Sequence, residues 1–223
     1  KPAITNSFSI FTLAGDQANR MQSQALDLAT KSPNSAREIA EGYFFLASAG
    51  LNAEQAMKAM PQIVRFAEAG MFNLARATEL AMDAQSALGL KVQDAEQNLV
   101  NLTRVTDVLV RANVLANANV EQFSISLTSK AGAALKAYNK DIEEGVAVLA
   151  AMADQGIKTQ LAGNALDRIF RLLAEASRES ADMHKALGFS VYDSGGKMRN
   201  FADIVQNLEH ILNPMSAELK SAT

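Results

Sequence analysis

Two histidines, His184 and His210, are the first residues here that could act as a general base or bind a metal ion, because imidazole does both near neutral pH. Neither lies in the H-E-x-x-H pattern that places two imidazoles on one helix face to bind zinc. Each is followed by apolar residues in a predicted helix, which favours a surface or packed histidine. The chain contains no cysteine, so thiol nucleophiles, disulfides and cysteine-based zinc sites are excluded.

A cluster of carboxylates, Asp141, Glu143 and Glu144, could supply general acid or base chemistry only in a desolvated cleft. The cluster stands at a predicted helix start, where the helix dipole alone favours carboxylates. The string DSGGK at 193–197 lacks the acidic positions of a calcium loop and the ending of a P-loop, so it predicts a turn. GFSVY at 188–192 does not match a nucleophile elbow. We therefore expect no enzyme activity, no cofactor and no metal site in these residues.

The charge pattern argues against nucleic acid as a specific partner. The net charge is −3, and a basic face through Arg168, Arg171 and Arg178 is interleaved with acidic residues, which is typical of a solvated helix face. Aromatic residues that could stack on bases are missing from this face. The longest apolar run, at 146–153, is far shorter than the roughly 20 residues that span a bilayer, so no membrane contact is expected through this segment.

Composition and helix-capping signals predict an all-α fold with many helices. Only 12 glycines and 4 prolines occur in 223 residues, and the remaining composition favours helix. A capping box, in which two side chains three residues apart each accept a backbone N–H of the other residue, is predicted at several helix starts. The pairs are Ser35 with Glu38, Asn52 with Gln55, Asn119 with Gln122, and Asp141 with Glu144.

Other signals place the remaining helices and their ends. Gly50 and Gly156 are expected to end helices. Pro61 lies inside a helical pattern, so that helix is expected to kink or to begin afresh there. Further helices are predicted in the opening stretch to about Lys31, after a loose start, and over 72–87, 94–116 and 177–187.

One stretch, 188–201, departs from the helical pattern. Phe189, Val191 and Met198 flank a string of turn-forming residues, which predicts a small β-hairpin near 189–199. The chain then returns to helix and meets Pro214, beyond which a following helix is expected.

Two strings recur in the same order and indicate a duplicated helical module. Residues 46–67 match 152–173, and the string ALG-x-x-V-x-D occurs at 87–94 and at 186–193. Two copies are too few for a solenoid, so we expect two related modules with the same internal geometry. The offset between copies falls from 106 to 99 residues, which predicts a longer inner helix or loop in the first. The domains predicted are a helical lead-in (1–45), a first module (46–118), a second module with the hairpin (119–213) and the start of a following helix (214–223).

Gly163 lies inside a predicted helix, where glycine is about 1 kcal/mol less favourable than alanine. A catalytic loop, a close helix contact or a family signature could each explain it. The missing side chain, one turn after the predicted cap Thr159, would allow another helix or the hairpin to approach closely. We expect Ala162, Gly163 and Ala165 to mark a close packing surface.

The segment DQGIKTQLAGNALDRIFRLLAE, followed by KALGFSVYDSGGKMRNFADIVQNL, closely resembles the core region of phage tail tape measure proteins. That family reads roughly G-I-x-x-x-x-A-G-x-A-L-[RK] and then L-G-[IVF]-x-V-x-D-x-x-G. The matching residues are Gly156, Ile157, Ala162, Gly163, Ala165, Leu166, Leu187, Gly188, Val191, Asp193 and Gly196. Asp167 departs from the pattern, since the family often has a basic residue there. Upstream, the segment around Gly50 resembles the family's first module, so the similarity covers about 37–212.

The resemblance implies a structural and assembly protein of a bacteriophage tail, which sets the length of the tail tube and leaves it before or with the DNA. It implies the tail tube protein, tail tip or baseplate proteins and tail assembly chaperones as partners, with self-association left open. It also implies location in the virion tail after synthesis in the host cytoplasm, and motif positions that serve packing and not catalysis. The chain begins at Lys1 and a ruler must be long, so we expect one module of a longer protein. The alternative is a membrane-active or murein-associated module that acts at genome delivery.

Overall fold

The computed structural model describes residues 15–221, and α-helices dominate this part of the chain. The predicted all-α fold is confirmed for these residues, whereas the loose start expected before the first helix lies outside them. The helices are α2 (Gly15–Lys31), α3 (Ala36–Ser48), α4 (Ala53–Gly70), α5 (Leu74–Ala87), α6 (Ala95–Leu115), α7 (Val120–Ser126), the π-helical turn η1 (Leu127–Ala131), α8 (Gly132–Ala137), α9 (Ile142–Asp154), α10 (Thr159–Glu179), α11 (Ala181–Leu187) and α12 (Phe201–Ser221).

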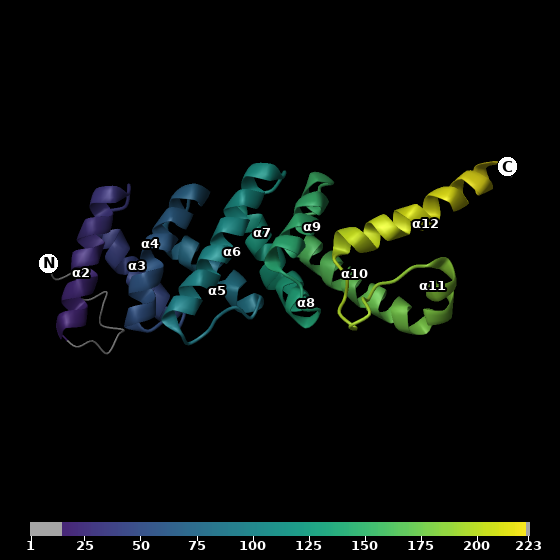
Figure 1. The fold of residues 1–223 in the computed structure, drawn as a ribbon. Coiled ribbons are helices and arrows are strands. Elements are labelled where there is room, and N and C mark those ends of the chain that lie inside the picture. Colours follow the sequence, from purple (N-terminus) through teal and green to yellow (C-terminus); the bar gives the residue numbers. More distant parts are fainter. Residues whose placement is uncertain (1–14, 222–223) are drawn as a thin grey trace.

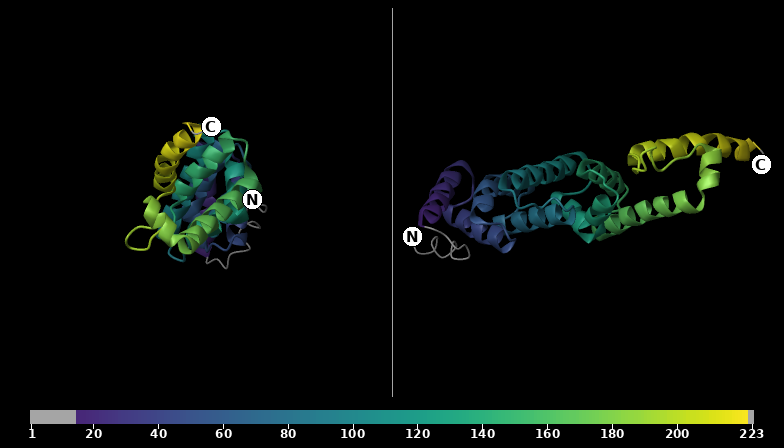
Figure 2. Two further views of the ribbon diagram at one scale, coloured as in Figure 1. Left: turned by 90° about the vertical axis from the view of Figure 1, so that its right-hand side faces the viewer. Right: turned by 60° about the horizontal axis from the view of Figure 1, so that its bottom comes forward.

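The helices form an elongated stack of two layers, in which consecutive helices alternate between the layers (Figure 1). One layer holds α2, α4, α6 and α9, and the other holds α3, α5, the continuous α7–η1–α8 helix and α10, as the right-hand view of Figure 2 shows. Each helix packs mainly on its neighbours in the stack, α4 on α6, α6 on α9, α5 on α7 and α7 on α10. Stacked helix pairs of this kind are typical of α-solenoids. The predicted division into two modules, 46–118 and 119–213, stays a prediction.

Three of the predicted capping boxes are present, at Ser35, Asn52 and Asn119. The fourth is wrong, because the carboxylate of Asp141 makes no cap bond to α9 and instead accepts from Arg104 of α6 at 2.9 Å. Thr159 is also not a cap. It is the first residue of α10 with a φ of 57°, and its carbonyl accepts from the Ser126 hydroxyl at 2.9 Å. At Asp141 a tertiary partner therefore replaces the local one.

The two predicted helix stops, Gly50 and Gly156, are confirmed. They have φ values of +84° and +82°, in the left-handed region that glycine adopts without strain. At each, the backbone N–H of the next residue donates to a carbonyl of the last helical turn. Leu51 donates to Leu46 at 3.1 Å, and Ile157 donates to Met152 at 2.9 Å.

The duplication of residues 46–67 at 152–173 is not shown. The helix that follows the first segment, α5, has 14 residues, and the one that follows the second, α11, has 7. The matched helices α4 and α10 stand in opposite layers and pack against different neighbours. The Asp94 side chain caps α6 by accepting from the backbone N–H of Gln97, whereas Asp193 lies in a turn that no helix follows directly. The glycine turns recur, but the packing around them does not.

The predicted β-hairpin near 189–199 is wrong. Residues 188–200 form a loop with one isolated antiparallel bridge, between Tyr192 and Met198, and no strand occurs in the described chain. The Asp193 carboxylate accepts from the backbone N–H groups of Gly195 and Lys197, both at 2.9 Å, and so closes a tight turn. Pairing cannot extend beyond the bridge because α12 begins at Phe201.

Two proline positions lie inside continuous helices. α12 runs through position 214, where a following helix was expected to begin. α4 runs through Pro61, so a fresh start there is wrong. Proline lacks the N–H that would donate to the carbonyl of Met57 one turn earlier. The Gln24 amide of α2 donates to that carbonyl at 3.0 Å, and the Tyr43 hydroxyl donates to the Gln24 side-chain oxygen. Gln24 thus supplies the hydrogen bond that Pro61 removes.

This arrangement predicts that Gln24→Ala lowers the free energy of unfolding by about 1–3 kcal/mol, because the Met57 carbonyl and the buried Tyr43 hydroxyl both lose a partner. In a Pro61→Ala background the restored backbone N–H donates to the Met57 carbonyl. Gln24→Ala should therefore lower the free energy of unfolding by roughly 1 kcal/mol less in that background. Urea denaturation of the four proteins in the cycle measures the difference. Equal costs in the two backgrounds would contradict this account of Pro61.

Candidate interaction surfaces

The motif residues of α10 form its buried face, where α10 lies against the α7–η1–α8 helix. Ala162, Gly163 and Leu166 are buried and Ala165 is half-buried. A Cβ atom built on Gly163 would overlap the carbonyl oxygen of Ser126 and the hydroxyl of Ser129, with the Ser126 carbonyl carbon at 3.1 Å. Backbone therefore occupies the space that a side chain would need.

The π-helical turn lies at this contact. Its closing bond joins the Gly132 N–H to the Leu127 carbonyl, five residues earlier, and so widens the helix locally. On its other side, a Cβ atom on Gly132 would lie 2.8 Å from the Cβ of Ala87 in α5. The α7–η1–α8 helix is thus held closely between α5 and α10.

The other motif positions lie elsewhere in the molecule. Val191 is the buried residue of this group in the 188–200 loop, while Asp193 and Gly196 are exposed at its turn. Gly188 ends α11 with a φ of +67°. Gly50 lies at the opposite part of the stack, after α3. The motif does not form one site, and a common role in packing stays a prediction.

The residues considered for catalysis are not brought together. His184 is half-buried, and its ring packs edge-on against Phe189 with ring centroids 4.9 Å apart, while His210 is exposed on α12. Arg104 donates to both Asp141 and Glu143, and its hydrogen bonds lower the pKa of Glu143. Among the described residues no group of histidine, aspartate or glutamate side chains could hold a metal ion. None of the described helices is long and apolar enough to cross a membrane.

Glu144, the third carboxylate of the cluster, has a role that the sequence did not indicate. It accepts from Lys140 at 3.0 Å and from the backbone N–H of Phe201, the first residue of α12, at 2.6 Å. The side chains of Lys140 and Glu144 are only 3% and 13% exposed. The pair is four residues apart at a helix start, and this local spacing gave no signal of the distant partner.

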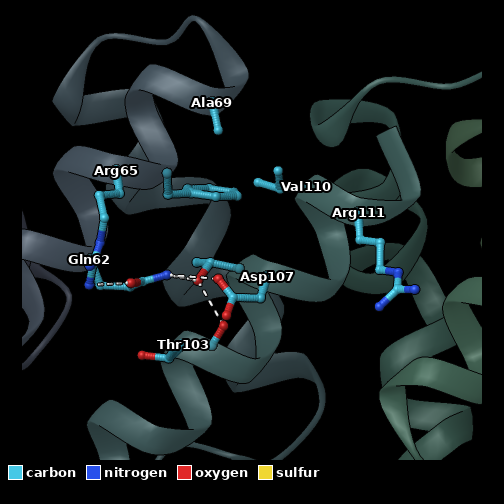
Figure 3. Close-up of a pocket in the computed structure, with 9 residues that line it drawn as sticks. Gln62, Arg65, Ala69, Thr103, Asp107, Val110 and Arg111 are labelled. Carbon is cyan, nitrogen blue, oxygen red and sulfur yellow. Dashed lines mark hydrogen bonds between the residues drawn. The ribbon is translucent and has the colours of Figure 1, made fainter. Parts of the chain in front are cut away.

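A pocket of about 450 Å³ lies between α4 and α6. The Gln62 amide donates to Thr106 at 2.6 Å and to Asp107 at 3.2 Å, while Arg65 donates to the Gln62 oxygen at 2.9 Å. Figure 3 shows Gln62 and Asp107 pointing toward each other, whereas Arg111 points away from them. Gln62 thus joins α4 to two side chains of α6 at this pocket.

Two further grooves continue this surface across the same layer. A groove of about 570 Å³ lies between α6 and α9, and one of about 600 Å³ lies between α9 and α12. Arg111 lines both the α4–α6 pocket and the α6–α9 groove. Ala147 and Ala151 of α9 line both grooves. The α4–α6–α9–α12 side therefore presents a row of shallow hollows with largely apolar walls.

The fold and these surfaces define a repeat-like, all-helical scaffold whose accessible features are grooves between helices. The chain belongs to the family of phage-related minor tail proteins, whose model matches residues 22–223. It is 31% identical over 184 residues to the tape measure protein of Pneumococcus phage Dp-1, and this alignment covers 82% of the chain. The chain spans only 15% of the length of that relative. No solved structure matches it.

The contact at Gly163 predicts that Gly163→Ala destabilises the protein, although alanine favours helix by about 1 kcal/mol at an unhindered position. Gly163→Leu should cost on the order of 1–3 kcal/mol or more through overpacking. Urea denaturation measures both, with Asn164→Ala at the exposed neighbouring position as the control. A Gly163→Ala protein more stable than wild type would show that the space is free.

Proposed function

We propose that this chain is a folded helical module of a tape measure protein, and that the whole protein sets the length of the tail tube during assembly. The observation that carries the proposal is the similarity to the Dp-1 tape measure protein, which extends over most of this chain. The match to the minor tail protein family over residues 22–223 supports a structural role in the phage tail.

The architecture supports a role in assembly through contact surfaces. The stack is elongated, and its grooves between α4, α6, α9 and α12 are shaped to receive side chains of a partner helix. We infer that the tail tube protein, tail tip or baseplate proteins and tail assembly chaperones are the partners of the whole protein. The proposed location is the virion tail, after synthesis in the host cytoplasm, with release from the tail during DNA ejection.

A change in the length of this segment should change the length of the tail. If the segment lies along the tube as extended helix, an in-frame deletion shortens the tail by about 1.5 Å for each residue removed, and an in-frame duplication lengthens it equally. Electron microscopy of negatively stained virions measures tail length, with synonymous recoding of the same codons as the control. Tails of unchanged length would contradict a ruler role for this segment.

Release during ejection has a separate test. Virions should contain peptides of this chain in the tail fraction, and tails purified after triggered DNA ejection should have lost them. Quantitative mass spectrometry compares the two preparations, with the tail tube protein as the internal standard. Equal amounts before and after ejection would contradict release while leaving the length measurement unaffected.

A further inference from the structure

The last part of the described chain is joined to the stack by few contacts. The C-terminal arm, defined here as residues 188–213, consists of the 188–200 loop and the first part of α12, and it projects beyond α9 in Figure 1. Within the described chain, α12 is absent from the pairs of helices that pack extensively, and α11 packs mainly on α10 and buries no residue. The arm must therefore depend on a small set of local contacts.

Polar contacts of the arm with the stack centre on one buried ion pair. The Lys140 ammonium group donates to Glu144 and to the backbone carbonyl of Arg199, and Glu144 accepts from the Phe201 N–H. The two side chains thus hold the chain on both sides of position 200. Asn200 itself accepts from the Ala202 N–H at 2.9 Å, so the first turn of α12 is capped by its own chain and by Glu144.

Electrostatics strengthen this junction. The Glu144 carboxylate lies in the first turn of α9 and at the start of α12, so it faces the positive ends of two helix dipoles as well as the Lys140 ammonium. Both charges are largely removed from water. Removal of one partner from such a pair leaves the other charge buried and uncompensated, which is far more costly than replacement of both.

The apolar part of the junction comes from the 188–200 loop and the first turns of α12, where Phe189, Tyr192 and Leu208 are half-buried against the core. The Phe201 ring packs edge-on against Phe170 of α10, with ring centroids 6.2 Å apart, and the arm buries Val191, Met198 and Ile204. Val205 and Leu212, further along α12, remain about half exposed, so the helix beyond its first turns is poorly covered. The anchorage is therefore concentrated at the first two turns of α12.

We propose that the Lys140–Glu144 pair is a latch that keeps the C-terminal arm on the stack, and that loss of the pair detaches the arm while α2–α10 stays folded. The arm is a releasable cap over Phe170 at the end of the stack. The proposal concerns the conformation of this chain and does not rest on its role in the tail.

Spin labels across the groove between α9 and α12 test the latch. The chain has no cysteine, so Ala151→Cys and Val205→Cys place one label on each helix, and both positions line that groove. We expect a narrow distance distribution that becomes broad and longer when Glu144→Ala is added. Glu143→Ala is the matched control, because it removes the adjacent carboxylate, whose partner Arg104 lies on α6.

Hydrogen exchange measured on the same proteins separates release of the arm from general destabilisation. Glu144→Ala should accelerate exchange in residues 201–213 by at least about tenfold and leave α4 and α6 unchanged. Where Glu144→Ala folds poorly, Glu144→Gln replaces it, since it keeps the side-chain volume and removes the charge. An unchanged distance distribution, or equal acceleration in α6 and α12, would overturn the proposal.

Discussion

Close approach between helices is the constraint on which this stack depends. Only 6% of the residues of the chain are aromatic, and glycines lie at contacts between helices. Gly163 lies against the backbone of Ser126, and Gly132 lies against Ala87. At these points the helix axes are close enough for backbone and short side chains to exclude water. The α7–η1–α8 helix, held from both sides, connects the first half of the stack to α10 and everything after it.

Buried and half-buried polar side chains fix how the helices are placed relative to one another. Gln24 of α2 donates to the Met57 carbonyl of α4, which Pro61 leaves without its helical donor. Gln62 joins α4 to Thr106 of α6, and Gln85 joins α5 to Asn98 of α6 at 3.1 Å. Each bond connects different helices, and each would leave a buried group unsatisfied if the helices shifted. Apolar packing between alanine-rich surfaces is less selective, so these bonds define a single arrangement.

A stack whose helices contact mainly their neighbours can lose structure from one end without the loss of all its contacts at once. This property suits a module of a protein that we propose to leave the tail during DNA ejection. It also agrees with an arm whose polar contacts with the stack centre on Glu144. The membership in the minor tail protein family and the architecture therefore lead to the same view of a contact-making helical scaffold.

The sequence by itself determined the features that depend on neighbouring residues: the all-α class, the capping boxes at Ser35, Asn52 and Asn119, and the helix stops at Gly50 and Gly156. Only the tertiary structure decided the features in which a distant partner competes with a local one. Arg104 takes the Asp141 carboxylate from its cap, and α12 begins too early for the 188–200 loop to extend into a hairpin. The grooves and the contact of Glu144 with Phe201 join residues far apart in the chain, and no local pattern encodes that distance.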